Sequence, residues 1–344
     1  MKNWKGIFTI ILSGVLLAFV LLRRESKRDF YEGLSNAKDF NEIFEKVGEI
    51  NLLPKGFIYG SLFEGVILSN SSMVLLDVFS NSLLKFSKNG NFIHKIGAVG
   101  DGPGEYRRPT KVCKDGNDDI YLFDSSELKI VVYDSSGRYK YQFRLSGYIS
   151  RMVVNDFGLY VQKFDPEDKM TIDHYSFQGK FKNSFSEMPN EHRNFLIQFT
   201  AGGGLVSDLS GNLYQIIPTK FEIKKFNPEG KLIKKFGKEP RYYRGYGKRL
   251  PDLSDRKVMQ RLVYEKTLIY NLFFLEPKFL LVQLVNHDEK MTPTSYIELY
   301  DTDGNFVNGG IKIPFLITFT WKNMICFVNP IESKLILYRI RWRF

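Results

Sequence analysis

The stretch that decides the fold runs from Gly97 to Arg144 and reads GAVGDGPGEYRRPTKVCKDGNDDIYLFDSSELKIVVYDSSGRYKYQFR. A loop rich in glycine and proline opens it, and four short apolar runs follow, separated from one another by turn residues. This pattern predicts one four-stranded antiparallel sheet together with its lead-in connection. The runs lie near Thr110–Cys113, Asp119–Phe123, Lys129–Tyr133 and Arg138–Phe143.

A glycine turn recurs along the chain at Gly90, Gly137, Gly179, Gly230 and Gly304. An aromatic residue stands four positions before each glycine, and a large apolar residue stands two positions after it. Glycine permits the positive φ of a tight hairpin turn, and we expect the bulky residues to sit close across the two strands and to fill the space between neighbouring sheets. The recurrence predicts a β-propeller. The aromatic residues are Phe86, Tyr133, Tyr175, Phe226 and Tyr300, and the apolar ones are Phe92, Tyr139, Phe181, Leu232 and Phe306.

The number of blades follows from counting strands. The last glycine interval is long because it holds an insertion (238–261) and a longer turn near His287–Pro293. A final sheet is expected in Ile313–Thr320, Asn323–Asn329 and Lys334–Trp342, which is one strand short, and one unpaired strand is left at Glu49–Leu53. Pairing that strand with the last sheet closes the ring and removes its open edges. The sequence therefore predicts an all-β, six-bladed propeller, with seven blades as the alternative.

The chain has 344 residues, of which 43% are hydrophobic and 15% aromatic, enough to bury a large core. Its formal net charge is +11, of which residues 1–28 contribute +5 and the rest +6. Because the body is only mildly basic, charge does not imply a nucleic acid partner.

An uncharged apolar run, Gly6–Leu22, stands near the N-terminus and is flanked by positive charges on both sides. Its length favours an uncleaved signal anchor that spans a membrane. We expect three parts: a signal anchor (1–28), a polar tether with a short helix over Asp39–Val47 (29–48), and the propeller (49–344). The expected location is membrane-anchored, with the propeller on the extracytoplasmic, periplasmic side, although the flanking charges do not decide the orientation.

One blade carries a family resemblance. The G-x-G-x-G-E-Y…P lead-in (100–109), the run Ile120–Asp124 and the run Ile130–Gly137 resemble an NHL-type repeat, and the whole chain resembles bacterial envelope proteins of the NHL-like six-bladed β-propeller class. The usual repeat keeps an Asp, an Asn and an Arg where this chain has Asp124, Glu127 and Lys129. The resemblance implies a propeller, and it admits either a binding protein or an enzyme of the lyase or lactonase type.

Catalytic and metal-binding motifs are not evident in the sequence. Cys113 and Cys326 are far apart and are interpreted as core residues, and the four histidines are not at metal-ligand spacing. The calcium cage and the histidine or zinc sites of related propeller enzymes have no matching motif, so we predict no catalytic residue, metal or cofactor. The acidic segment Asp115–Asp119 is interpreted as a solvated turn, and Asp124 as a residue that accepts backbone N–H groups.

The insertion is the candidate interaction surface, since tyrosine and arginine are the residue types that anchor interfaces. The alternative is a solvated loop packed on its own tyrosines. The candidate binding residues are Arg241, Tyr242, Tyr243, Arg244, Tyr246, Lys248 and Arg249.

These observations favour a membrane-anchored, non-catalytic binding or scaffold propeller that engages a protein or an anionic glycan or other polymer through loops on one face. An NHL-like or lactonase-like enzyme with a site at the central channel is the alternative. RNA binding is a third hypothesis, which the export signal disfavours. The sequence does not indicate an oligomeric state.

Overall fold

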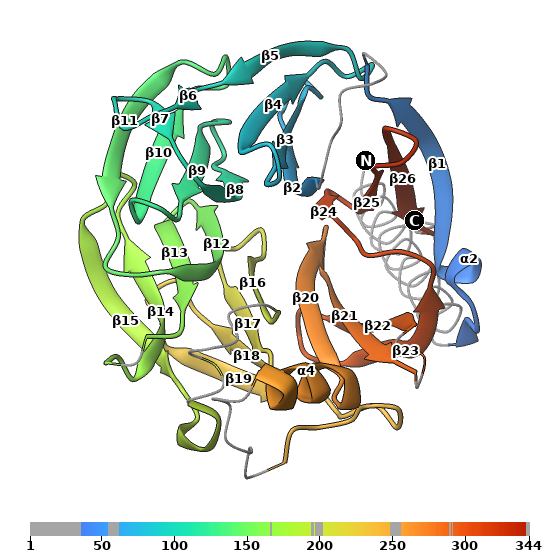
Figure 1. The fold of residues 1–344 in the computed structure, drawn as a ribbon. Helices are drawn as coiled ribbons and strands as arrows, with labels where there is room; N and C mark the ends of the chain where they lie inside the picture. The colour runs from blue at the N-terminus through green and yellow to red at the C-terminus, as the bar shows by residue number, and fades with distance from the viewer. Residues whose placement is uncertain are drawn as a thin grey trace, which may run out of the picture.

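The computed structural model describes residues 36–53, 62–165, 167–193, 196, 202–247, 256–288, 290 and 292–341. These residues form six four-stranded antiparallel sheets and one two-stranded parallel sheet. Figure 1 shows the six sheets arranged as blades around a central axis, and the innermost strand of each blade contacts the innermost strands of its two neighbours. The six-bladed all-β propeller predicted from the turn pattern is confirmed.

Five blades follow the chain in order, and in each the first strand is innermost and the last is outermost (Figure 1). Blade 1 comprises β2 Leu62–Ile67, β3 Met73–Asp77, β4 Ser82–Phe86 and β5 Phe92–Ile96. Blade 2 comprises β8 Pro109–Lys114, β9 Ile120–Asp124, β10 Lys129–Tyr133 and β11 Tyr139–Arg144, and blade 3 comprises β12 Ile149–Asn155, β13 Gly158–Lys163, β14 Met170–Tyr175 and β15 Phe181–Glu187. Blade 4 comprises β16 Gly204–Ser207, β17 Leu213–Ile217, β18 Lys220–Phe226 and β19 Leu232–Phe236, and blade 5 comprises β20 Leu268–Leu275, β21 Phe279–His287, β22 Pro293–Asp301 and β23 Phe306–Ile313.

The sixth blade joins the two ends of the described chain. It contains β24 Phe319–Trp321, β25 Met324–Asn329 and β26 Lys334–Ile340, and its fourth strand is β1, Phe44–Asn51. β1 is antiparallel to β26, with Glu49 opposite Ile336. The expected strand at Glu49–Leu53 therefore exists but begins earlier. The innermost strand of this blade is shorter than the expected Ile313–Thr320, since Ile313 belongs to β23 of the preceding blade and β24 begins at Phe319.

The expected helix over Asp39–Val47 is reduced to one turn, α2 Phe40–Ile43. The Asp39 carboxylate caps this turn by accepting hydrogen bonds from the N–H groups of Asn41 and Glu42. From Phe44 onward the backbone is extended, because pairing with β26 supplies more hydrogen bonds than a short isolated helix could form. The structure thus has one of the one or two helical turns expected in this segment, and Phe44–Val47 belongs to β1.

Several middle strands of the blades are buried along their whole length. Every residue of β3, β4, β9, β10 and β17 is buried, whereas the outer strands β5 and β11 alternate between exposed and covered positions. A middle strand lies between two neighbouring blades, so continuous apolar runs such as IYLFD suit it. An outer strand has one face toward solvent, which favours alternation.

All five turn glycines have positive φ, between +82° and +93°. Each donates its N–H to the carbonyl three residues earlier, as Gly137 does to Asp134. The aromatic residue before each glycine is buried and lies directly across the hairpin from the apolar residue after it, as Tyr300 does from Phe306. That second residue, however, lies on the outermost strand, and Phe306 is 58% exposed. The expectation that both residues fill the space between sheets is therefore correct for the first, whereas of the second residues only Phe92 is partly buried and packs against a core cluster.

The same glycines lie close against the preceding blade. A Cβ added at Gly179 would lie 2.2 Å from Phe143 on the outermost strand of the preceding blade, and one added at Gly230 would lie 2.4 Å from Phe185. At Gly90 of blade 1, the neighbour is the carbonyl of Asn51 in β1. β1 thus occupies the position in blade 6 that the last strand occupies in the other blades.

The glycine-rich segment before blade 2 is a connector between blades. It contains β6 Ala98–Val99 and β7 Glu105–Tyr106, which pair in parallel. The Tyr106 hydroxyl donates to the Ile96 carbonyl at 2.7 Å and accepts from the Leu83 N–H at 3.1 Å, which joins the segment to blade 1.

The predicted signal anchor (1–28) lies outside the described residues. Among the helices that the structure describes, none is long and apolar enough to cross a bilayer. The other helical segments are η1 Asn190–His192 and α4 Arg256–Glu265, which belongs to the insertion and contacts β21.

Candidate functional site

The innermost strands enclose a central channel that widens into two cavities. One cavity, of about 380 Å³, is lined by the later residues of these strands, and the other, of about 660 Å³, by their earlier residues. Five residues line both cavities and so mark the waist between them. They are Glu64, Lys111, Arg151, Asn271 and Thr318. The first four come from β2, β8, β12 and β20, so no single blade forms this waist.

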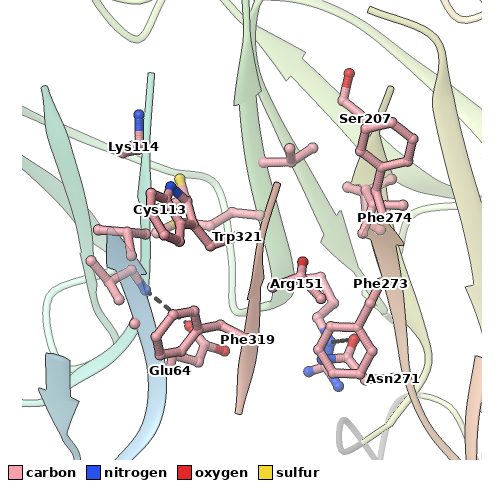
Figure 2. Close-up of a pocket in the computed structure, with 18 of the residues that line it drawn as sticks. Glu64, Cys113, Lys114, Arg151, Ser207, Asn271, Phe273, Phe274, Phe319 and Trp321 are labelled. Atoms are coloured by element: carbon pink, nitrogen blue, oxygen red, sulfur yellow. Dashed lines mark hydrogen bonds between the residues drawn. The ribbon is translucent and has the colours of Figure 1, made fainter. Parts of the chain in front are cut away.

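Glu64 and Lys111 form an ion pair on one side of the waist. Lys111 Nζ lies 2.8 Å from Glu64 Oε1, and Glu64 Oε2 accepts the Val112 N–H at 2.9 Å. Both carboxylate oxygens are therefore engaged, and the charge of Glu64 is balanced by a partner from the next blade. Figure 2 shows Glu64 beside Phe319 at this level of the cavity.

Arg151 lies across the channel from blade 3 to blade 5. Its guanidinium donates to the Ser150 carbonyl at 2.8 Å, the Tyr270 carbonyl at 2.9 Å and Asn271 Oδ1 at 3.2 Å. All three acceptors are neutral, and among the ion pairs of the described residues none includes Arg151. Burial lowers the pKa of Arg151 from its ordinary value, and the more distant Glu64 charge opposes that shift.

The three charged groups at the waist leave one positive charge in excess. Glu64 neutralises one cation, Lys111, and Arg151 keeps its charge among neutral acceptors. Because no carboxylate balances the charge of Arg151, the electrostatic potential in the cavity beside it is positive. Such a potential attracts an anion.

Aromatic and sulfur-containing side chains line the smaller cavity beyond the waist. Phe273, Phe274 and Trp321 face it from blades 5 and 6, and Cys113 faces it from blade 2 (Figure 2). Burial raises the pKa of the Cys113 thiol far above its ordinary value, so the sulfur is protonated at neutral pH. The cavity thus combines an apolar wall with a cationic floor.

The described residues contain no group of three or more His, Cys, Asp or Glu placed to hold a metal ion. The carboxylate at the waist is occupied by Lys111 and a backbone N–H, and the thiol in the cavity is not ionised. The arrangement around Arg151 is suited to binding an anion.

The insertion residues lie away from the channel. Tyr242 stacks on Tyr296 with ring centroids 4.2 Å apart, and its hydroxyl donates to Glu298 Oε1 at 2.5 Å. Tyr243 packs near Phe221. These two rings pack on blades 4 and 5. This agrees with the alternative interpretation of the insertion as a loop that is packed through its tyrosines.

The other candidate binding residues differ in how exposed they are. Tyr246 is 4% exposed, Arg244 donates to the His287 carbonyl at 2.9 Å, and Arg241 is exposed. Lys248 and Arg249 lie outside the described residues. The role of the insertion as an interaction surface therefore stays a prediction. Its tyrosines contribute to packing in this structure.

The turns singled out in the sequence are structural. Asp115 Oδ1 accepts the N–H groups of Asn117 and Asp119, which makes 115–119 a tight turn. Asp124 accepts the Ser126 N–H as predicted, and also those of Arg107 and Arg108 in the connector. Cys326 is a core residue as expected, whereas Cys113 lines the channel.

The waist residues were not predicted from the sequence, although the sequence contains a pattern that indicates them. Glu64 and Arg151 interrupt the apolar runs LFEGVI and ISRMVVN at the first strand of a blade. A charged residue inside an otherwise apolar innermost strand faces the channel, and that pattern could have identified both.

Comparison with known protein families identifies the family of this chain. The family DUF5128, described as a 6-bladed beta-propeller, matches residues 36–305. The chain belongs to this family. The match begins just before α2 and ends inside blade 5 of this DUF5128 propeller.

Solved structures share its fold at low sequence identity. A Bacteroides fragilis protein provisionally classed as exported is 14% identical, with a TM-score of 0.65, 90% of this chain and 98% of that chain covered. A DUF4221 family member from Bacteroides vulgatus is 9% identical, with a TM-score of 0.63, 87% of this chain and 98% of that chain covered. At such identities the likeness concerns the fold alone.

Among curated proteins, the Drosophila melanogaster protein brain tumor is 24% identical over 152 residues. The match covers 42% of this chain and only 14% of that protein's length. It does not establish the narrower NHL-like class, which stays a resemblance.

Proposed function

We propose that this DUF5128 protein is an extracytoplasmic, non-catalytic binding propeller that takes the anionic group of an organic ligand into its central channel. The observation that carries the proposal is Arg151, a partly buried cation at the waist whose hydrogen-bond acceptors are all neutral. An anion approaching along the cavity would supply the missing countercharge.

The cavity beyond the waist indicates the rest of the ligand. Its volume of about 380 Å³ lies within the range of small-molecule sites, and Phe274 and Trp321 offer flat apolar surfaces. A carboxylate attached to a planar apolar body fits this combination, since the charge would face Arg151 and the ring would pack on the aromatic wall.

The absence of catalysis is part of the proposal. A hydrolase or lyase at the channel would need a poised base or nucleophile, and Glu64 and Cys113 are two lining residues of these types. Glu64 is neutralised by Lys111, and the raised pKa of Cys113 keeps its thiol protonated. The geometry favours the binding hypothesis over the enzyme hypothesis for these reasons.

The extracytoplasmic location rests on the apolar run Gly6–Leu22, which we interpret as an anchor. A propeller of the same fold from Bacteroides fragilis is provisionally classed as exported, which is consistent with this location. A protein or anionic polymer partner at one face, including the exposed Arg241, belongs to the same proposal.

The test compares ligands that differ only in charge. We expect indole-3-acetate to bind the purified protein in calorimetry and to change its tryptophan fluorescence, whereas indole-3-acetamide binds more weakly by about tenfold or more. Arg151→Gln should remove this preference for the anion. Arg144→Gln, which removes an exposed arginine paired with Glu127, is the matched control and should leave binding unchanged.

Equal binding of the acid and the amide, or equal loss in both variants, would refute the channel as an anion site. Turnover of either compound would refute the non-catalytic reading. Thermal unfolding of Arg151→Gln must show a folded protein, since Arg151 also connects blades 3 and 5.

A further inference from the structure

Blade 4 places lysines directly opposite one another on adjacent strands. In the antiparallel pairing of β18 with β19, Lys224 lies opposite Lys235 and Lys225 lies opposite Lys234. Like charges in this position repel each other and destabilise a sheet. Two such pairs in succession therefore call for a compensating interaction on each face of the blade.

The two faces of blade 4 differ in how the charges of their lysine pair are compensated. On the side of blade 5, Lys225 Nζ donates to the Thr302 carbonyl at 3.0 Å, and Lys234 Nζ donates to the Asp303 carbonyl at 2.5 Å. These carbonyls belong to the glycine turn of the next blade. This pair is thus engaged by the fold itself.

On the side of blade 3, the compensation is weaker. Lys224 Nζ donates to Ser186 Oγ and to the Glu187 carbonyl, both at 3.2 Å and both neutral. Burial and the neighbouring charges of Lys235 and Lys220 lower the pKa of Lys224. Among the ion pairs of the described residues, none joins Lys224 or Lys235 to a carboxylate.

This pair opens into a groove between blades 3 and 4 with a cavity volume of about 320 Å³. Lys169 and Lys220 also line it, so four lysines face three glutamates and leave one positive charge in excess. Lys220 Nζ is 3.3 Å from Glu222 Oε2, whereas no ion pair among the described residues includes Lys169, Lys224 or Lys235. The glutamates are Glu187, Glu191 and Glu222.

Gln215 lines the groove and belongs to a network of buried polar side chains. Ser186 Oγ donates to Gln215 Oε1, and Gln215 Nε2 donates to Gln162 Oε1 at 3.0 Å and to Thr171 Oγ1 at 2.9 Å. All four residues are buried. Lys224 Nζ donates to Ser186 Oγ of this network, which places its ammonium group at the groove.

We propose that this groove binds an acidic oligosaccharide, with a uronate carboxylate between Lys224 and Lys235. Sugar hydroxyl groups are hydrogen-bond donors, and the carboxylates of Glu187 and Glu191 and the side chain of Asn190 are available along the groove to accept from them. A uronic acid residue has hydroxyl donors for these carboxylates beside its own charge, whereas the phosphates of a nucleic acid are acceptors only and would meet the same glutamates unfavourably. The mixed lining therefore fits an acidic sugar better than a polyphosphate.

The groove shares no lining residue with either channel cavity, so this inference is independent of the proposed channel ligand. Either site can fail its test while the other holds.

The test uses hexagalacturonate as the probe, with maltohexaose as its neutral counterpart and a single-stranded hexanucleotide as the competing polyanion. We expect calorimetry on the full chain to show binding of hexagalacturonate alone, weakening as salt rises. The double variant Lys224→Gln with Lys235→Gln should lose about tenfold or more in affinity. The double variant Lys225→Gln with Lys234→Gln removes the same charges from the other face of the same two strands and should bind as the unaltered chain does.

Three results would overturn the inference: no binding of hexagalacturonate, equal loss in the two double variants, or tighter binding of the hexanucleotide. Lys235→Glu separates binding from folding, since it should abolish binding while raising the midpoint of thermal unfolding. A folded Lys235→Glu protein that still binds the probe would also refute the site.

Discussion

Asp124 holds three segments of blade 2 together through one buried carboxylate. It accepts the N–H groups of Arg107 and Arg108 at 3.0 and 2.9 Å, and the Ser126 hydroxyl at 2.7 Å. Burial acts to raise the pKa of Asp124, but the hydrogen bonds from Arg107, Ser126 and Arg108 outweigh it, so its pKa is lowered.

Asp124→Asn should lower the free energy of unfolding by about 2 kcal/mol, because an amide NH₂ would face backbone N–H groups that need an acceptor. The lowered pKa means that the carboxylate stabilises the fold fully above its ordinary value of 3.8 and loses this effect as pH falls through the folded-state pKa. Urea unfolding at pH 7 and in that acid range measures both effects. A variant with unchanged stability at pH 7 would contradict the assignment.

Glu298 has the opposite pH dependence. Burial raises its pKa, and the hydrogen bonds from the Tyr242 hydroxyl and the Gly310 N–H offset only part of that shift. The native state therefore retains the proton, so the stabilisation is complete below the ordinary value of 4.5 and is lost as pH rises through the folded-state pKa.

Glu298→Gln keeps a carbonyl acceptor for both hydrogen bonds and removes the titration. The variant should therefore lack the fall in stability that the unaltered chain shows above pH 4.5. Urea unfolding at a series of pH values compares the two curves. Parallel curves would show that Glu298 does not cause the fall.

At the scale of elements, each turn glycine both makes a hairpin and seats it on the preceding blade. Gly179→Ala imposes a positive φ of +82° on alanine and places its Cβ 2.2 Å from Phe143, so we expect a loss of about 3 kcal/mol in unfolding free energy. Gly247 also has a positive φ, but nothing lies within 4 Å of an added Cβ. Gly247→Ala should cost only about 1 kcal/mol, and equal losses in denaturant unfolding would exclude the blade contact as the cause.

The facing lysines of β18 and β19 predict that this strand pair is less stable than one with opposite charges at the same positions. Lys235→Glu replaces a repulsive cross-strand pair by an attractive one, so we expect a gain of about 0.5 kcal/mol in unfolding free energy. Lys231→Glu, in the turn that joins the same strands, changes the charge equally without a facing lysine and serves as the control. A destabilised Lys235→Glu variant would show that Lys235 has a structural partner.

At the scale of the whole molecule, the ring depends on a strand from the other end of the described chain. Phe44 of β1 is 1% exposed and packs in a core cluster with residues of blades 5 and 6. Phe44→Ala should cost about 3–5 kcal/mol, whereas Val47→Ala, at a 40% exposed position of the same strand, should cost much less. Hydrogen exchange at Leu335–Ile340 should accelerate in Phe44→Ala, and unchanged protection there would argue against β1 as the strand that secures the ring.

The channel site also exists only at this scale. Glu64 from blade 1 meets Lys111 from blade 2, and Arg151 from blade 3 reaches the backbone of Tyr270 in blade 5. Opening the ring would separate these partners. Anion binding in the channel and closure of the ring should therefore be lost together.

The sequence alone determined the hairpins, the turn glycines and the count of blades, because the residues that form a turn such as Asp134–Arg138 are neighbours along the chain. It also located the strand that would pair with the end of the chain. The length of α2, the inward packing of Tyr242 and the meeting of Arg151 with blade 5 were decided by the tertiary structure. Each of these depends on groups far apart in sequence, and local spacing does not specify which of them will come into contact when the ring forms.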